Sequence, residues 1–121
     1  MAVLSAILLY VPTADSASAG SLTVTDVKEL AGTWQGYGRG YFGSGRLPLT
    51  WTVAEDGTYS SVGASVTSGK IELANGKLSF DSGFTAGTLT VEERDGKNLM
   101  IVEGTNKRNR QSGMAELFKI K

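Results

Sequence analysis

Few side chains of the sequence could do acid–base chemistry, and they lie far apart along the chain. Tyr59, Glu116 and Arg46 could act as proton or charge partners in an enzyme that folds a substrate for cyclisation or isomerisation. However, nothing in the sequence assembles a catalytic group with its base, and no P-loop, nucleophile elbow or dinucleotide fingerprint occurs. We therefore expect no catalytic residue and no cofactor, and an enzyme is the third hypothesis for this chain.

The composition narrows the chemistry further. The 121 residues contain no histidine and no cysteine, which are the commonest metal ligands, so we predict no metal site. Lysine and arginine number 12, and so do aspartate and glutamate. With no net charge to attract a polyanion, we expect no nucleic-acid partner.

Two groups of charged residues leave alternatives open. The run Lys107-Arg108-Asn109-Arg110 could hold an anionic head group through forked hydrogen bonds, or it could be a solvated loop. Glu116 shares a strand face with apolar side chains, so it is either exposed or half buried beside a cation.

The first residues resemble an export signal. Ala2 to Val11 form an apolar run that is too short to span a bilayer, and Ala17-Ser18-Ala19 suits a cleavage site. No Lys or Arg precedes the run. We predict a signal peptide over 1–19. Such a peptide implies that the protein is secreted or periplasmic and that it does not insert into a membrane after cleavage. An N-terminal segment with a short helix follows over 20–31, and the folded domain covers 32–121.

From Thr33 onward, turn signals recur about every 11 residues between stretches rich in Val, Thr and aromatic residues. They divide the chain into eight short strands joined by short loops, which predicts an all-β, antiparallel, up-and-down barrel with a short N-terminal helix. Alternation places Leu49, Trp51 and Val53 on the inward face of one strand. Leu78 with Phe80 repeats this pattern.

A glycine stripe marks the first barrel strand, in which Gly36, Gly38 and Gly40 alternate between Trp34 and Phe42. Because side chains alternate between the two faces of a strand, the glycine stripe faces inward, and the stripe has two interpretations. The glycines permit tight coiling while large residues from facing strands fill the space, or they leave a cavity opposite Trp51 and Tyr59. An interior void above about 300 Å³ would favour a carrier of small molecules, and a filled interior would favour a partner bound on the surface.

Successive turns of a meander alternate between the two ends of the barrel, so the flexible loops gather at one end. We expect the mouth there and the helix at the other end. The predicted cavity residues are Gly36, Gly38, Gly40, Trp51, Tyr59 and Phe80, the predicted rim residues are Tyr41, Phe42, Arg46, Phe84, Lys107, Arg108 and Arg110, and Trp34 is predicted to close the barrel.

The short helix followed by Leu30-Ala31-Gly32-Thr33-Trp34 resembles the start of lipocalins and wider calycins, whose first motif is G-x-W. The resemblance extends from about Asp26 to the end of the chain. It implies a barrel that binds a small apolar ligand. In that family an arginine on the last strand covers the tryptophan, whereas this chain offers Lys119 and Lys121.

Our leading hypothesis is thus a lipocalin-like protein, monomeric or weakly dimeric, that binds a small apolar or amphipathic molecule. The ligand can have an anionic end if Arg46, Arg108 and Arg110 reach that end. The alternative is a protein-binding module. Leu30 to Trp34 also resembles the L-S-G-x-W segment of small periplasmic metalloprotease inhibitors. In that case Gly20 to Thr25 would enter the cleft of a secreted enzyme.

Overall fold

The structure of the protein is a computed structural model that describes residues 19–40, 43–63 and 65–121. The predicted leader, apart from Ala19, and the predicted rim residues Tyr41 and Phe42 lie outside these residues. The described elements, in chain order, are β2 (Ala19–Ser21), the 3-10 helix η2 (Val27–Leu30), β3 (Gly32–Gly40), β4 (Gly43–Val53), β5 (Thr58–Val62), β6 (Val66–Ala74), β7 (Lys77–Asp81), β8 (Thr85–Arg94), β9 (Lys97–Asn106) and β10 (Ser112–Lys119).

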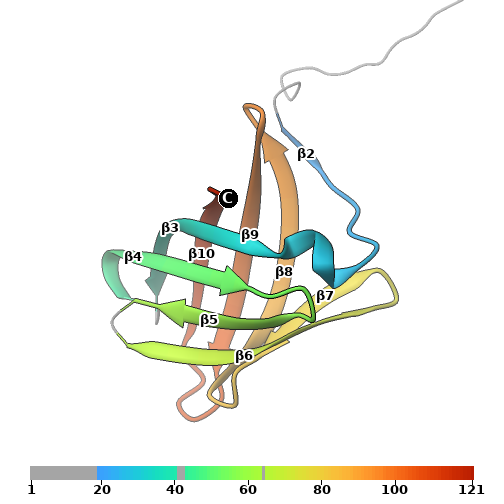
Figure 1. Ribbon diagram of the computed structural model, residues 1–121. Coiled ribbons are helices and arrows are strands. Elements are labelled where there is room, and N and C mark those ends of the chain that lie inside the picture. The colour runs from blue at the N-terminus through green and yellow to red at the C-terminus, as the bar shows by residue number, and fades with distance from the viewer. Residues whose placement is uncertain (1–18, 41–42, 64) are drawn as a thin grey trace, which may run out of the picture.

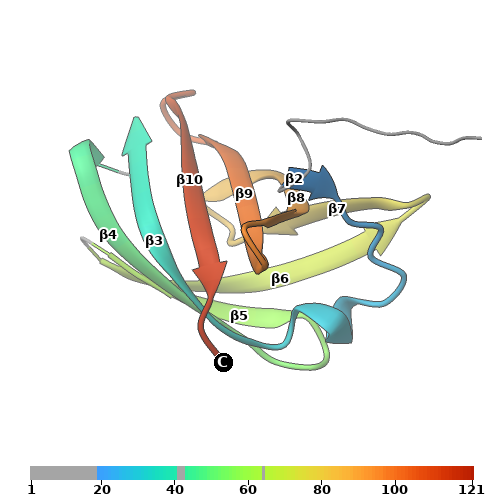
Figure 2. The ribbon, with the colours of Figure 1, turned by 90° about the horizontal axis from the view of Figure 1, so that it is seen from above.

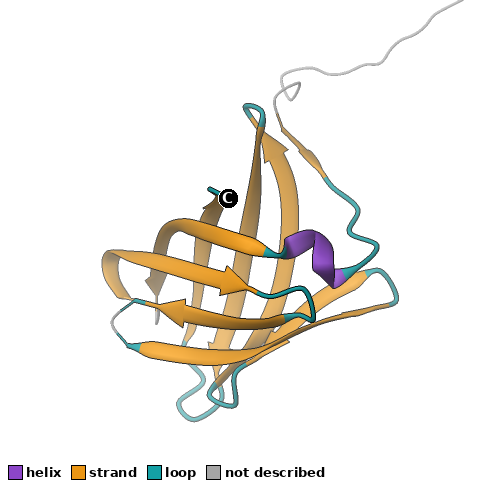
Figure 3. Cartoon of the chain, viewed as in Figure 1, coloured by secondary structure: helices purple, strands orange, loops and turns teal. Residues whose placement is uncertain are grey.

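The strands form a closed barrel (Figures 1 and 3). Each strand from β3 to β10 pairs antiparallel with the next, and β10 pairs back with β3. The short β2 pairs with the part of β8 that extends beyond β7, so it lies outside the ring of eight. The predicted all-β, eight-stranded, up-and-down barrel is confirmed.

The core lies on the inward faces that alternation predicted. Leu49, Trp51 and Val53 of β4 are buried, as are Leu78 and Phe80 of β7. The structure turns Ala115 and Leu117 inward, and it leaves Met114, Glu116 and Phe118 on the outer face, where they are half buried.

Tight turns join the strands at one end of the barrel. Asn75-Gly76 and Asp95-Gly96 have positive φ at both positions, the conformation of two-residue hairpin turns with the right-handed strand twist. Gly57, also at positive φ, ends a third turn that begins at Ala54. Asn-Gly and Asp-Gly dipeptides are typical of such tight hairpin turns.

The 3-10 helix lies at this same end, against β6 (Figure 2). Leu30 belongs to the buried core, and Val24 and Val27 pack against it. Asp26 caps the helix by accepting a hydrogen bond from the Lys28 amide at 3.0 Å. Thr25, the preceding residue, donates its hydroxyl hydrogen to Glu29 at 2.7 Å. Both hydrogen bonds stabilise the start of the helix, and the apolar contacts of Leu30 and Val27 hold it against the barrel.

At the opposite end, glycines from five neighbouring strands lie in one register row. Gly87 pairs with Gly104, Gly104 with Gly113, Gly113 with Gly40, and Gly40 with Gly43. The predicted stripe on β3 is therefore one edge of a two-dimensional glycine patch. Because a row without side chains adds nothing to the interior, residues from the facing strands must supply the filling there.

Barrel closure depends on another glycine of the β3 stripe, Gly36. Gly36 is paired with Leu117 of β10, and a Cβ at Gly36 would overlap the backbone carbonyl of Glu116. The backbones of β3 and β10 thus approach more closely than any side chain would allow.

We expect Gly36→Ala to destabilise the protein by about 1–3 kcal/mol, because the added methyl must push two paired backbones apart. The measurement is the urea midpoint of unfolding at constant slope. Gln35→Ala is the control, since Gln35 is the exposed neighbour on the same strand. Equal midpoints for the two variants would contradict the close approach.

Candidate functional site

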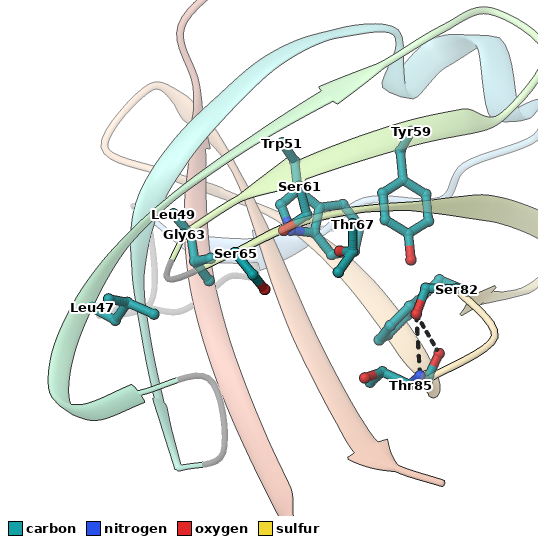
Figure 4. A pocket seen from close by; sticks show the side chains of 11 residues that line it. Leu47, Leu49, Trp51, Tyr59, Ser61, Gly63, Ser65, Thr67, Ser82 and Thr85 are labelled. Atoms are coloured by element: carbon teal, nitrogen blue, oxygen red, sulfur yellow. Dashed lines mark hydrogen bonds between the residues drawn. The ribbon is translucent and has the colours of Figure 1, made fainter. Parts of the chain in front are cut away.

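A pocket of about 130 Å³ opens at the loop-rich end of the barrel (Figure 4). Every residue that lines it comes from β4 to β8 or from the loops between these strands. These residues are Leu47, Leu49, Trp51, Tyr59, Ser61, Gly63, Ser65, Thr67, Phe80, Ser82 and Thr85. The pocket therefore lies at the end where the loops predicted a mouth.

Three aromatic rings form the inner part of the pocket. Trp51 and Tyr59 stack with centroids 4.3 Å apart and planes 6° apart. Phe80 meets Trp51 edge-on at 5.5 Å and 77°. The stacked contact of Trp51 with Tyr59 and the edge contact of Phe80 orient the three rings relative to one another.

The rings also explain why the barrel interior is mostly filled. A Cβ at Gly104 would lie 2.8 Å from Phe80 Cζ, and a Cβ at Gly69 would lie 2.7 Å from the Tyr59 hydroxyl. These aromatic side chains occupy the room that the glycines leave. The remaining volume of about 130 Å³ is less than half of the roughly 300 Å³ at which drug-sized pockets begin. By the volume criterion stated from the sequence, the interior counts as filled, which favours a partner bound on the surface over a carrier of drug-sized molecules.

The outer part of the pocket is lined by hydroxyl groups. Ser61, Ser65, Thr67, Ser82 and Thr85 supply them, and none of the described residues that line the pocket is charged. Ser82 and Thr85 order the loop between β7 and β8, since the Ser82 amide donates to the Thr85 carbonyl at 2.9 Å and the Thr85 amide donates to Ser82 Oγ at 3.1 Å.

Of the predicted cavity residues, the structure brings Trp51, Tyr59 and Phe80 together in this pocket. Gly36 and Gly38 lie on the inward side of β3, paired with the buried Leu117 and Ala115, but they do not line it. Their backbone instead contributes to a groove of about 390 Å³ that also includes the outward side chains of β3 and β10.

None of the predicted rim residues that the structure describes lines the pocket. Phe84 is 71% exposed, and Arg108 and Arg110 are exposed in the loop before β10. Arg46 lies over the ring of Tyr37, with its guanidinium carbon 4.0 Å from the ring centroid, and both residues line the outer groove.

One ion pair joins the loops beside the mouth. Lys107 Nζ contacts both carboxylate oxygens of Asp81 at 2.9 Å, and the Lys107 amide donates to the Phe84 carbonyl at 2.8 Å. The Lys107 ammonium, with the Gly83 amide, lowers the pKa of Asp81 below its ordinary value of 3.8. This contact fixes the β7–β8 loop, which carries Ser82, relative to the loop after β9.

Trp34 lies at the closed end of the barrel, where it is 1% exposed. Its indole Nε1 donates to the Leu30 carbonyl at 2.8 Å, which ties β3 to the 3-10 helix. Lys119 Nζ of the last strand lies 5.9 Å from the centroid of the Trp34 ring.

Sequence reasoning missed the hydroxyl lining. Continuing the alternation from Tyr59 places Ser61 and Gly63 on the same inward face, so that signal was available on β5. Ser82 and Thr85 carried no such signal, because a loop brings them to the mouth.

The three residues considered for acid–base chemistry are not all brought together. Glu116 and Arg46 both line the outer groove, whereas Tyr59 lines the interior pocket. Within the described part of the chain, no group of His, Cys, Asp or Glu side chains is arranged to hold a metal ion.

Among the described residues, no helix has the length and apolar character needed to cross a membrane.

Comparisons of the chain with protein-family models, with curated proteins and with solved structures gave no match. The fold class and the pocket geometry are therefore the basis for a functional proposal.

We expect Asp81→Asn to reduce the loss of stability in acid. A carboxyl whose folded pKa is depressed stabilises the fold above its unfolded pKa, near 3.8, and this contribution disappears as the pH falls through the lower folded pKa. The urea midpoint should therefore fall less between pH 6 and pH 2.5 in Asp81→Asn than in the wild type. Glu72→Gln, a change at an exposed strand position, serves as control, and equal pH dependence in all three proteins would refute the prediction.

Proposed function

We propose that this chain is a lipocalin-like binding protein for a small, uncharged, largely apolar molecule about the size of one six-membered ring. The observation that carries the proposal is the pocket at the barrel mouth, with aromatic rings inside and hydroxyl groups outside. An apolar cavity of about 150 Å³ is large enough for benzene, which sets the scale for a pocket of about 130 Å³.

The lining favours an uncharged ligand over the anionic end considered from the sequence. Burying a charge without a partner is costly, and the arginines that could neutralise one lie away from the pocket. Asp81 and Lys107 already neutralise each other beside the mouth.

Two features support the lipocalin resemblance. The Trp34 motif lies at the closed end under a short helix, and Lys119 occupies the place over its ring that the resemblance gives to an arginine. A secreted or periplasmic location stays a prediction from residues 1–19.

The proposal is tested by thermal shift with benzene, cyclohexanone and decanoate, together with native mass spectrometry of the purified protein. We expect the two single-ring compounds to raise the melting temperature and decanoate to leave it unchanged. No shift with any of these probes, and no co-purified small molecule, would refute the proposal.

We expect Ser61→Leu to weaken the binding of the ring compounds at least tenfold, because the larger side chain fills the pocket. Ser60→Leu is the matched control, since Ser60 is the adjacent residue of β5 and points to the opposite face. Calorimetric titration measures both variants, and circular dichroism checks that each is folded. Undiminished binding by a folded Ser61→Leu would place the binding site elsewhere.

The alternative, inhibition of a secreted protease through Gly20 to Thr25, draws support from the mostly filled interior and from Leu22, which is 40% exposed. However, this segment is held by the barrel: Gly20 and Ser21 pair with β8, and the Leu22 amide donates to the Val91 carbonyl at 2.8 Å.

We therefore expect no inhibition of a zinc metalloprotease such as thermolysin by the wild-type protein, because a paired segment is not free to enter a cleft. Peptide-hydrolysis rates measure this. Inhibition that is present in the wild type and lost in Leu22→Asp would favour the alternative.

A further inference from the structure

The net charge of zero conceals an uneven distribution of charge along the barrel. Four of the five arginines lie at or near the end of the barrel that carries the pocket. Arg39 is the residue before the last one of β3, and Arg46 lies near the start of β4. Arg108 and Arg110 lie in the loop between β9 and β10. All four side chains are exposed to solvent.

Most acidic residues lie away from the pocket end. Those at the opposite end, where lysines and Arg94 balance them, are Asp26, Glu29, Glu55, Asp56, Glu92, Glu93 and Asp95. Glu103 and Glu116 lie within β9 and β10. Asp81 is at the pocket end, but Lys107 contacts both of its carboxylate oxygens at 2.9 Å. The pocket end therefore has an excess of positive charge.

Exposed apolar side chains flank the pocket at this same end. Phe84 is 71% exposed, and Val62 and Val66, which are register partners on β5 and β6, are 48% and 72% exposed. Each of the three is next in sequence to a residue that lines the pocket. Figure 4 shows Ser65, beside Val66, and Thr85, beside Phe84, on different sides of the pocket. Apolar side chains gathered round one opening, with charged residues outside them, are typical of an interaction site.

The aromatic ring and two of the arginines belong to adjoining loops (Figure 1). The Lys107 amide donates to the Phe84 carbonyl at 2.8 Å, which joins the β9–β10 loop to the β7–β8 loop. The Asn106 side-chain oxygen accepts hydrogen bonds from the amides of Arg108 at 2.9 Å and of Asn109 at 3.2 Å, which orders the cationic loop. The fold thus presents an apolar ring and guanidinium groups next to each other.

We propose that the pocket end of the barrel docks on an anionic lipid surface. The exposed arginines bind lipid phosphates through forked hydrogen bonds, while Phe84, Val62 and Val66 enter the layer between the head groups and the acyl chains. The contact is peripheral, because loop side chains reach the lipid and no strand enters the bilayer. This inference goes beyond the proposed function and does not depend on it.

The arrangement favours a lipid surface over other anionic partners. A protein partner needs one continuous patch of about 800 Å², whereas these apolar side chains project from separate loops around an opening. A nucleic acid binds to cations and aromatic rings, but valine side chains cannot stack on its bases. A fluid lipid layer accommodates separate loops, takes up apolar side chains and supplies phosphates.

Binding to vesicles, measured by sedimentation, tests the docking. The full chain should bind vesicles of mixed phosphatidylcholine and phosphatidylglycerol roughly tenfold more tightly than vesicles of phosphatidylcholine alone, since each arginine near an anionic surface adds about a fivefold gain in affinity. High salt should weaken the binding, because it screens exposed charges.

A pair of double variants tests the charges. Arg108→Gln/Arg110→Gln should weaken binding to the anionic vesicles roughly tenfold. Lys97→Gln/Lys121→Gln removes two exposed cations at the opposite end and should bind as the wild type does. Every variant keeps residues 1–18, so any contribution of that segment to vesicle binding is common to all of them.

The apolar side chains are tested in the same way. Phe84→Ser and Val66→Ser should each weaken vesicle binding severalfold, because less apolar surface enters the lipid. Ile120→Ser is the matched control, since Ile120 is 50% exposed at the opposite end of the barrel. Circular dichroism checks that each variant is folded.

A local probe reports which end touches the lipid. Trp34 and Trp51 are buried, so a tryptophan added at an exposed position is the one that lipid can reach. Brominated lipids in the anionic vesicles should quench the added fluorescence of Phe84→Trp and leave that of Ile120→Trp unchanged.

Equal binding to anionic and neutral vesicles, or quenching of Ile120→Trp alone, would overturn the inference. Undiminished binding by Phe84→Ser and Val66→Ser, with loss in the arginine variant, would overturn it in favour of a soluble polyanion. A wild-type dimer that Phe84→Ser dissociates in sedimentation velocity would assign the surface to a second copy of this chain instead. Ring compounds are titrated without vesicles, so a failure of docking leaves the proposed function standing.

Discussion

The close approach of β3 and β10 is the constraint on which the rest of this structure depends. An up-and-down meander becomes a barrel only when its last strand pairs with its first, and here Gly36 leaves room for the Glu116 carbonyl. Closure removes the free edges of both strands, which would otherwise expose unpaired backbone groups. The glycine row from β8 to β4 continues the same bare wall across the mouth.

Because the glycine-lined side of the barrel has few side chains, residues of the opposite side must fill the interior. Large residues of β4, β5 and β7 fill the interior against it, as the contact of Phe80 with Gly104 shows. The barrel therefore encloses a small pocket rather than a wide calyx. Both interpretations of the glycine stripe contain part of the answer, because the glycines permit tight closure while aromatic rings take most of the space that they vacate.

The same packing produces the chemical asymmetry between the tryptophans. Trp34 lies at the end that the 3-10 helix closes, where a backbone carbonyl is free to accept its hydrogen. Trp51 of β4 is the register partner of Trp34, and its Nε1 has no hydrogen-bond partner among the described residues. The Trp34 indole therefore contributes a hydrogen bond that joins β3 to the 3-10 helix, whereas Trp51 contributes packing against Tyr59 and Phe80.

The sequence by itself determined the fold class, the inward residues of most strands and the end of the barrel that carries the tight turns. Those features follow from local rules: alternation separated Trp51 and Phe80 from their polar neighbours, and Asn75-Gly76 required a tight hairpin. Only the tertiary structure decided the size and lining of the pocket. The pairing of neighbouring strands aligned Gly87 with Gly104 and Gly104 with Gly113. Loop geometry brought Ser82 to the mouth and left Arg108 and Arg110 exposed to solvent. Such placements depend on register and on the packing of whole side chains across the barrel, and no local pattern contains that information.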